Sequence, residues 1–198
     1  MSPQPPQAAE GTACSAEGLL ARIGRGDAVA MEALYDEHSP VLYAVALRIV
    51  GDRAEAEDVL HDAFVLVAER ALQYDHRRGT VASWLVTIVR NLGIDRVRRR
   101  QRRGQKTEQV LAHEPAPPQP TPETLTSAAA GSSRIRRALA TLPEVQRATL
   151  EIAFFDGLSY SEIAERENVP VGTIKSRAAR ALAALREALA REGVTEPW

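Results

Sequence analysis

The sequence predicts an all-α protein made of two small helical domains that are joined by a flexible, proline-rich linker. Apolar residues recur at helical spacing on both sides of this linker. Residues 107–133 hold five prolines between Pro115 and Pro122 and no lysine or arginine, so they cannot bury a core and should be extended. Near the C-terminus, a helix, a tight turn and a second helix follow one another. The predicted organisation is a disordered leader over 1–15, domains over 16–105 and 134–192, and a linker over 106–133.

Charge is distributed unevenly along the chain. The formal net charge is only −1, yet residues 90–106 carry 8 basic and 1 acidic side chains, whereas residues 1–89 carry 7 and 13. The almost neutral net charge of the whole chain therefore hides one strongly basic segment, which is typical of a nucleic-acid contact.

Composition also limits the compartment and the chemistry. Cys14 is the only cysteine and cannot form an internal disulfide, and no Cys/His cluster has metal-ligand spacing, so we predict neither a metal nor another cofactor. The sequence has no apolar run of about 18 residues and its first residues do not resemble a secretory signal. These features predict a cytoplasmic protein without a membrane span.

The first domain begins with Ser15, which can cap a helix whose apolar face starts with Leu19. Two further helices are expected at about 28–37 and 41–50, because Pro40 should start a new helix and Gly51 should end it.

The pattern of residues 52–71 predicts the next helix, with an acidic face. Its core positions have helical spacing: Val59, Leu60, Ala63, Phe64 and Val67. The acidic residues at the other positions form either an ordinary solvated surface or a binding face, and periodicity alone leaves both alternatives open.

Residues 81–103 predict one long helix after a loop that pivots at Gly79. The first half is nearly apolar, and the second half carries six arginines and one acid. Like charges three or four residues apart destabilise a helix. An external anion such as a nucleic-acid backbone should therefore neutralise these arginines. A solvated basic face is the alternative. We expect Trp84 to lie in the core rather than to stack on a base.

Residues 158–182 predict a helix-turn-helix. Ser159 and Glu162 have the spacing of a capping box, and Pro170 ends the first helix. The second helix should bury Ile174, Ala178, Leu182 and Leu185. Its exposed donors would then be Thr173, Lys175, Ser176, Arg177 and Arg180. Short polar groups and cations at the front of such a helix suit the major groove, although a plain helical hairpin with a basic face is also possible.

Both halves resemble one known family. Residues 34–103, from LYDEHSPVL to VRRRQRR, resemble the second region of bacterial sigma factors, and residues 142–187, from LPEVQRATL to ALAALRE, resemble their fourth region. The likeness is greatest to the extracytoplasmic-function (ECF) group. It implies a protein that binds core RNA polymerase, recognises the −35 and −10 promoter elements, and melts the downstream one. It also implies an anti-sigma partner and a linker that threads through the polymerase.

The resemblance also implies roles for individual residues. Core polymerase would contact Asp58, His61 and Asp62, although the family often has Gln in place of His61. The −10 element would contact Gly79, Thr80, Arg90, Asn91, Arg96, Arg98, Arg99 and Arg100. Asn91 offers a donor and an acceptor to an unstacked base, or else it is a buried polar residue that satisfies a turn. The −35 element would contact the five donors of the second helix, with Lys175 and Arg177 closest to the bases.

Two other classes of protein remain as alternatives. A helix-turn-helix regulator that binds duplex DNA as a dimer would leave the basic and acidic helices without a role. An enzyme would need a nucleophile–base pair, a glycine-rich phosphate loop or a metal cluster, and the sequence shows none of these patterns. We therefore predict a non-enzymatic initiation factor.

Overall fold

The computed structural model describes residues 15–104 and 128–191, and every regular element in these ranges is helical. This confirms the predicted all-α class. The predicted leader, apart from Ser15, and most of the predicted linker lie outside the described residues. Among the described helices, none is long and apolar enough to cross a bilayer.

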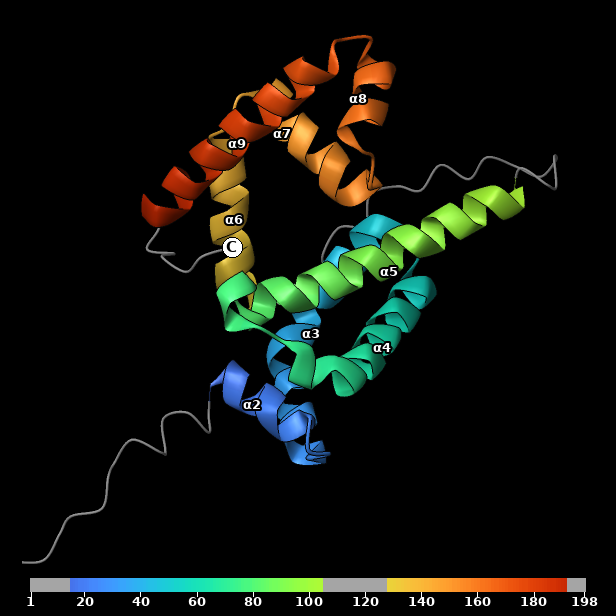
Figure 1. The fold of residues 1–198 in the computed structure, drawn as a ribbon, viewed down its shortest axis with the longest axis vertical. Helices are drawn as coiled ribbons and strands as arrows, with labels where there is room; N and C mark the ends of the chain where they lie inside the picture. Colours follow the sequence, from blue (N-terminus) through green and yellow to red (C-terminus); the bar gives the residue numbers. More distant parts are fainter. Residues whose placement is uncertain (1–14, 105–127, 192–198) are drawn as a thin grey trace, which may run out of the picture.

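The N-terminal group contains four α-helices that pack around one core (Figure 1). The helices are α2 (Ala16–Ile23), α3 (Ala28–Val50), α4 (Arg53–Arg70) and α5 (Val81–Gly104), with short 3-10 turns η1 (Ala71–Gln73) and η2 (His76–Arg78) between the last two. Ser15 accepts the Gly18 N–H at 3.1 Å and caps α2, as predicted. The five predicted core residues of α4 are all buried.

Helix α3 corrects the prediction at Pro40, which lies inside one continuous helix instead of starting a new one. Proline removes one helical hydrogen bond, a cost that usually ends a helix. Here the buried residues Leu34, Leu42 and Ala46 form one stripe across the proline. Packing of this stripe against the shared core therefore outweighs the local preference. Gly51 ends the helix in the left-handed conformation, as predicted.

The loop before α5 is held by specific contacts. Gly79 has a φ of 137°, and its carbonyl accepts the Tyr74 hydroxyl at 2.8 Å. Trp84 is partly buried and packs against the core, and its ring forms an edge-type pair with the Tyr74 ring at a centroid distance of 5.8 Å. The expectation that Trp84 belongs to the core is confirmed.

The C-terminal group contains α6 (Ala128–Ala140), α7 (Glu144–Glu151), the π-helical turn η4 (Ile152–Asp156), α8 (Tyr160–Glu167) and α9 (Val171–Arg191). Helix α6 begins at Ala128, five residues before the predicted end of the linker at 133. Residues 128–130 are alanines, the strongest helix formers, and they extend the helix despite Gly131 and the two serines that follow it.

The predicted helix-turn-helix is present. The Ser159–Glu162 capping box forms with both hydrogen bonds, and Asn168 turns the chain in the left-handed conformation. Within α9, Ile174, Ala178 and Ala181 are buried, whereas Leu182 is 43% exposed, so its predicted place in the core was wrong. The buried stripe advances by four and then three residues, which brings Ala181 inward and rotates Leu182 out.

The two groups of helices touch each other. Turn η4 packs against α5 and α3, and α6 also contacts α3. In Figure 1, α5 passes directly beneath the C-terminal helices. The predicted basic helix thus lies at the boundary between the two groups.

Candidate polymerase and nucleic-acid interfaces

Helix α4 presents the predicted polymerase-binding residues together. Asp58, His61 and Asp62 are all exposed, and their spacing of three and four places them on one face of the helix. Val65 continues this face and is 46% exposed. Sequence reasoning missed Val65, although its spacing of three from Asp62 was available as a signal. The face therefore combines acids with an apolar side chain, as protein interfaces commonly do.

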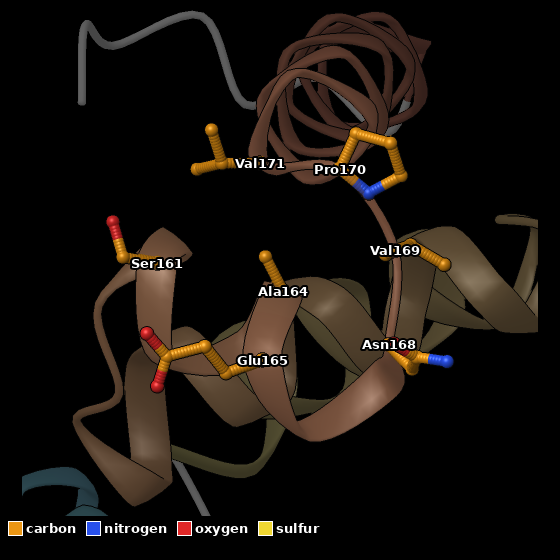
Figure 2. A pocket seen from close by; sticks show the side chains of 7 residues that line it. All are labelled: Ser161, Ala164, Glu165, Asn168, Val169, Pro170 and Val171. Carbon is orange, nitrogen blue, oxygen red and sulfur yellow. The ribbon is translucent and has the colours of Figure 1, made fainter.

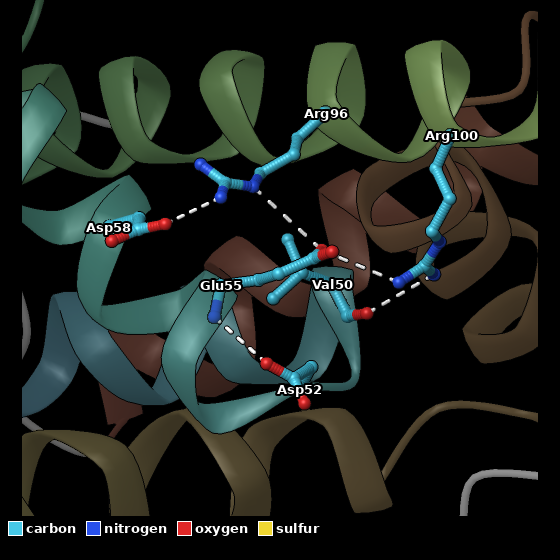
Figure 3. Close-up of polar contacts among 6 residues, drawn as sticks. All are labelled: Val50, Asp52, Glu55, Asp58, Arg96 and Arg100. Carbon is cyan, nitrogen blue, oxygen red and sulfur yellow. Dashed lines mark hydrogen bonds and ion pairs between the residues drawn. The ribbon is translucent and has the colours of Figure 1, made fainter. Parts of the chain in front are cut away.

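Two of the predicted DNA-binding arginines pair with acids of α4 (Figure 3). Arg96 Nη2 lies 2.6 Å from Asp58 Oδ2, and Arg96 Nε lies 3.8 Å from Glu55 Oε2. Arg100 Nη1 lies 3.3 Å from Glu55 Oε2, and its Nη2 donates to the Val50 carbonyl at 3.3 Å. These arginines neutralise part of the acidic helix and help hold α5 on α4.

Two other arginines of α5 point to the C-terminal group. Arg90 donates from Nε to the Phe154 carbonyl at 2.8 Å and from Nη2 to the Ala153 carbonyl at 2.7 Å. Arg98 donates from Nη2 to the Gly157 carbonyl at 2.8 Å. Burial lowers the pKa of Arg90 below its ordinary value, and the Arg98 charge lowers this pKa further. Arg90 remains a cation at neutral pH, because an arginine titrates far above it.

Asn91 and Arg99 are exposed on α5. The Asn91 Oδ1 accepts only a long hydrogen bond from Arg90, at 3.4 Å, so the alternative that Asn91 is a buried residue satisfying a turn was wrong. Thr80 instead has a local structural contact, since its Oγ1 accepts the Ser83 N–H at 3.2 Å. Thr80 therefore satisfies one of the free N–H groups in the first turn of α5.

The front of α9 carries three of its five predicted donors on the surface. Lys175, Ser176 and Arg180 are exposed, and Arg180 lies over Ser176 with Nη2 3.3 Å from Oγ. Thr173 is half-buried. Arg177 is also half-buried and pairs with Glu167 of α8, with 2.6 Å between Nη1 and Oε2. Arg177 thus contacts its own domain in this structure.

An open hollow lies between α8 and the start of α9 (Figure 2). It is lined by Ser161, Ala164, Glu165, Asn168, Val169, Pro170 and Val171. Glu165 is the one ionisable group among these residues, so the lining offers no acid–base pair. Elsewhere in the described ranges, no three His, Cys, Asp or Glu side chains are grouped to hold a metal ion.

Comparison with known proteins assigns the chain to a family. Residues 34–103 match Sigma-70 region 2, and residues 132–185 match Sigma-70 region 4. The sigma factor SigL of Mycobacterium tuberculosis is 38% identical over 173 residues, which cover 85% of this chain and 94% of SigL. The chain belongs to the ECF RNA polymerase sigma factors. SigK of Mycolicibacterium vanbaalenii is 30% identical over 173 residues, or 87% of this chain and 88% of SigK.

Solved structures of sigma factors are also similar. Rhodobacter sphaeroides SigE, solved with the anti-sigma ChrR, is 30% identical with a TM-score of 0.46, covering 88% of this chain and 97% of that chain. RpoE from Bartonella quintana, solved with the anti-sigma factor NepR, is 26% identical with a TM-score of 0.41. The match covers 78% of this chain and 93% of the RpoE chain. The predicted resemblance to ECF sigma factors is confirmed by the family matches and by the sequence relatives.

The two matched regions contain the predicted site residues of this sigma factor. The candidates on α4 and α5 lie in region 2, and those on α9 lie in region 4. Sequence reasoning missed the residues that join the two regions, namely Arg48, Ile94, Glu151 and Phe155. No periodic signal could have found them, because each contacts a residue far away in the chain.

Proposed function

We propose that this ECF sigma factor binds core RNA polymerase through the exposed face of α4 and reads a promoter through two separate surfaces. Region 2 would hold the −10 element with Asn91 and the arginines of α5. Region 4 would read the −35 element with Lys175, Ser176 and Arg180. The protein would act in the cytoplasm and use binding energy alone, without catalysing a reaction.

One observation carries this proposal. The chain presents an acidic helix face with an exposed apolar residue, a helix rich in arginine, and a helix-turn-helix with an exposed basic front, in the order of regions 2 and 4. A surface that combines acids with Val65 suits a basic protein partner, whereas the arginines suit phosphates. A single polypeptide that carries both surfaces can place a polymerase on DNA.

The proposed contacts with the −10 element and with the −35 element differ in their chemistry. Asn91 can donate to and accept from the edge of an unstacked base, and cations beside it can hold the single-stranded backbone. The short side chain of Ser176 and the longer Lys175 and Arg180 can reach base edges in a major groove. Family membership also leads us to propose that an anti-sigma factor binds this chain.

Assembly with polymerase tests the proposal. The purified chain should elute with core RNA polymerase as one complex in size-exclusion chromatography. That complex should retain genomic DNA fragments that share two sequence blocks at a fixed spacing, and the chain alone should retain few of them. If the chain does not join the core enzyme, or if the chain alone selects the same fragments, the proposed function is wrong.

A further inference from the structure

Helix α5 carries one acid inside its basic segment. Asp95 is the only acidic side chain among residues 90–106, which hold eight basic ones. It is exposed, and it lies one turn after Asn91 and one turn before Arg99 on the same face of the helix. A carboxylate opposes the binding of phosphates. The face that we assign to the −10 element therefore contains a group that lowers its general affinity for DNA.

The Asp95 carboxylate has no partner in the protein, although cations surround it. Arg96 donates instead to Asp58, with 2.6 Å between Nη2 and Oδ2, and Arg98 donates to a backbone carbonyl of the C-terminal group. Arg99 has the spacing of a helical ion pair with Asp95. Within residues 15–104 and 128–191, however, the Asp95 side chain forms no ion pair and accepts no hydrogen bond. It can therefore bind a group outside the chain without breaking a contact.

A carboxylate distinguishes base edges because it has no donor of its own. When ionised it only accepts hydrogen bonds. In the major groove, cytosine and adenine present an exocyclic amine that donates, whereas guanine and thymine present acceptors in its place. Asp95 would therefore attract a cytosine or an adenine and repel a guanine or a thymine. Attraction and repulsion together discriminate more strongly than attraction alone.

We propose that Asp95 determines part of the −10 specificity: its carboxylate accepts a hydrogen bond from the exocyclic amine of a cytosine or an adenine in the duplex beside the melted segment. This inference rests on the proposed function, because it takes α5 to be the −10 surface. Four residues of a helix advance by about 6 Å and one base step by about 3.4 Å. The base pair that Asp95 reads should therefore lie within about two steps of the base at Asn91.

Asp95→Ala is the most informative variant, because it removes the attraction and the repulsion together. Asp95 is exposed and unpaired within the described ranges, so the midpoint of thermal unfolding should stay unchanged. Glu32→Ala is the matched control, since Glu32 is exposed on α3 and its loss changes the net charge by the same amount. A change in base preference that appears only in Asp95→Ala cannot come from net charge.

The first measurement is selection by holoenzyme from a duplex library with a randomised −10 block. At one position, the parent and Glu32→Ala should retain cytosine or adenine at least about fivefold over guanine or thymine, the lower end for a specific base contact. Asp95→Ala should lose this preference and keep the others. If Asp95→Ala keeps every preference of the parent, the proposed base contact is overturned.

The second measurement deletes the amine from the DNA. At the selected position, 2-pyrimidinone replaces cytosine, or purine replaces adenine. The weaker base pair affects both proteins, so the comparison of parent with Asp95→Ala isolates the contact. The deletion should cost the parental holoenzyme at least about fivefold more affinity than it costs Asp95→Ala. An equal cost for the two proteins would overturn the contact and leave the proposed function intact. A parental holoenzyme that selects no shared −10 block would remove the proposed function itself.

Discussion

Asp58 and Arg96 form an ion pair between helices α4 and α5, with 2.6 Å between Oδ2 and Nη2. One residue belongs to the proposed polymerase surface and the other to the proposed DNA surface. The side chains are 62% and 34% exposed, so the pair contributes only about 0.2–1 kcal/mol to folding. We therefore expect that a polymerase contact to Asp58 would break this pair at small cost and leave Arg96 more available to a phosphate. Glu55 also lies beside Arg96 and Arg100.

Charge reversal on α4 tests the polymerase surface. Asp62→Lys should slow association with core polymerase and reduce the salt dependence of binding, because exposed interface charges act mainly on encounter. Asp58→Lys should weaken binding similarly and also lower the free energy of unfolding by up to about 1 kcal/mol, because it breaks the pair with Arg96. Surface plasmon resonance across a salt series measures the first effect, and urea unfolding measures the second.

Glu32→Lys is the control for these reversals. Glu32 is exposed and its reversal changes the net charge by the same amount, but it lies on another helix, α3. If Glu32→Lys slows association as much as Asp62→Lys does, the effect comes from net charge rather than from the proposed face.

Asn91→Ala tests the proposed base contact. Asn91 is exposed and has only a long hydrogen bond from Arg90, so we expect unchanged stability and unchanged assembly with core polymerase. We expect fewer open complexes, measured as permanganate reactivity of melted thymines. Gln101→Ala removes another exposed amide from α5 and should leave melting unchanged. Parental reactivity in Asn91→Ala would assign this residue no part in melting.

Arg177 and Arg180 of α9 should behave differently. Arg177→Ala leaves the half-buried Glu167 without its cation, so it should lower the midpoint of thermal unfolding. Arg180→Ala should leave that midpoint unchanged and alter the sequences that holoenzyme selects from a library of randomised −35 elements. Losing a bidentate arginine–guanine contact would cost about 1–3 kcal/mol at one position. If Arg177→Ala alone changes the selected sequences, the original expectation from the sequence holds and the pair with Glu167 must open on DNA.

The capping box of α8 predicts a pH dependence. Hydrogen bonding with the Ser159 hydroxyl, and then with its backbone N–H, lowers the pKa of Glu162 below its ordinary value. A lowered carboxyl pKa stabilises the folded state fully above the unfolded value of about 4.3, and this contribution is lost as pH falls through the folded value.

Glu162→Gln isolates this contribution. Glutamine can still accept the Ser159 N–H but does not titrate in this range. The difference in unfolding midpoint between parent and variant should be constant from neutral pH to about 5 and should shrink as pH falls further. A difference that stays constant down to pH 3 would contradict the assignment.

Local chemistry explains which parts of the fold could be predicted. Ser15, Ser159 and Gly51 act within a few residues of themselves, and each forms the predicted cap or helix end. Pro40 was misjudged because its effect depends on the core beneath α3. Leu182 was misjudged because helical spacing alone did not distinguish it from Ala181.

The partners of the arginines could not be predicted in the same way. The basic segment of α5 was recognisable from its composition, but Arg96 meets Asp58 across 38 residues and Arg90 meets Phe154 across 64. Such contacts depend on how the helices pack. The structure therefore divides the segment into arginines that contact α4, arginines that contact η4 or the residue after it, and the exposed residues Arg99, Arg102 and Arg103.

Transcription by core RNA polymerase that carries no other sigma factor tests the central claim most directly. The purified chain is added to this bare core enzyme with genomic DNA as template, and the 5′ ends of the transcripts are sequenced. We predict initiation at a limited set of sites that share a −35 and a −10 block and are absent without the chain. Transcripts that appear only when another sigma factor is also present would contradict the account and would identify the chain as a regulator instead.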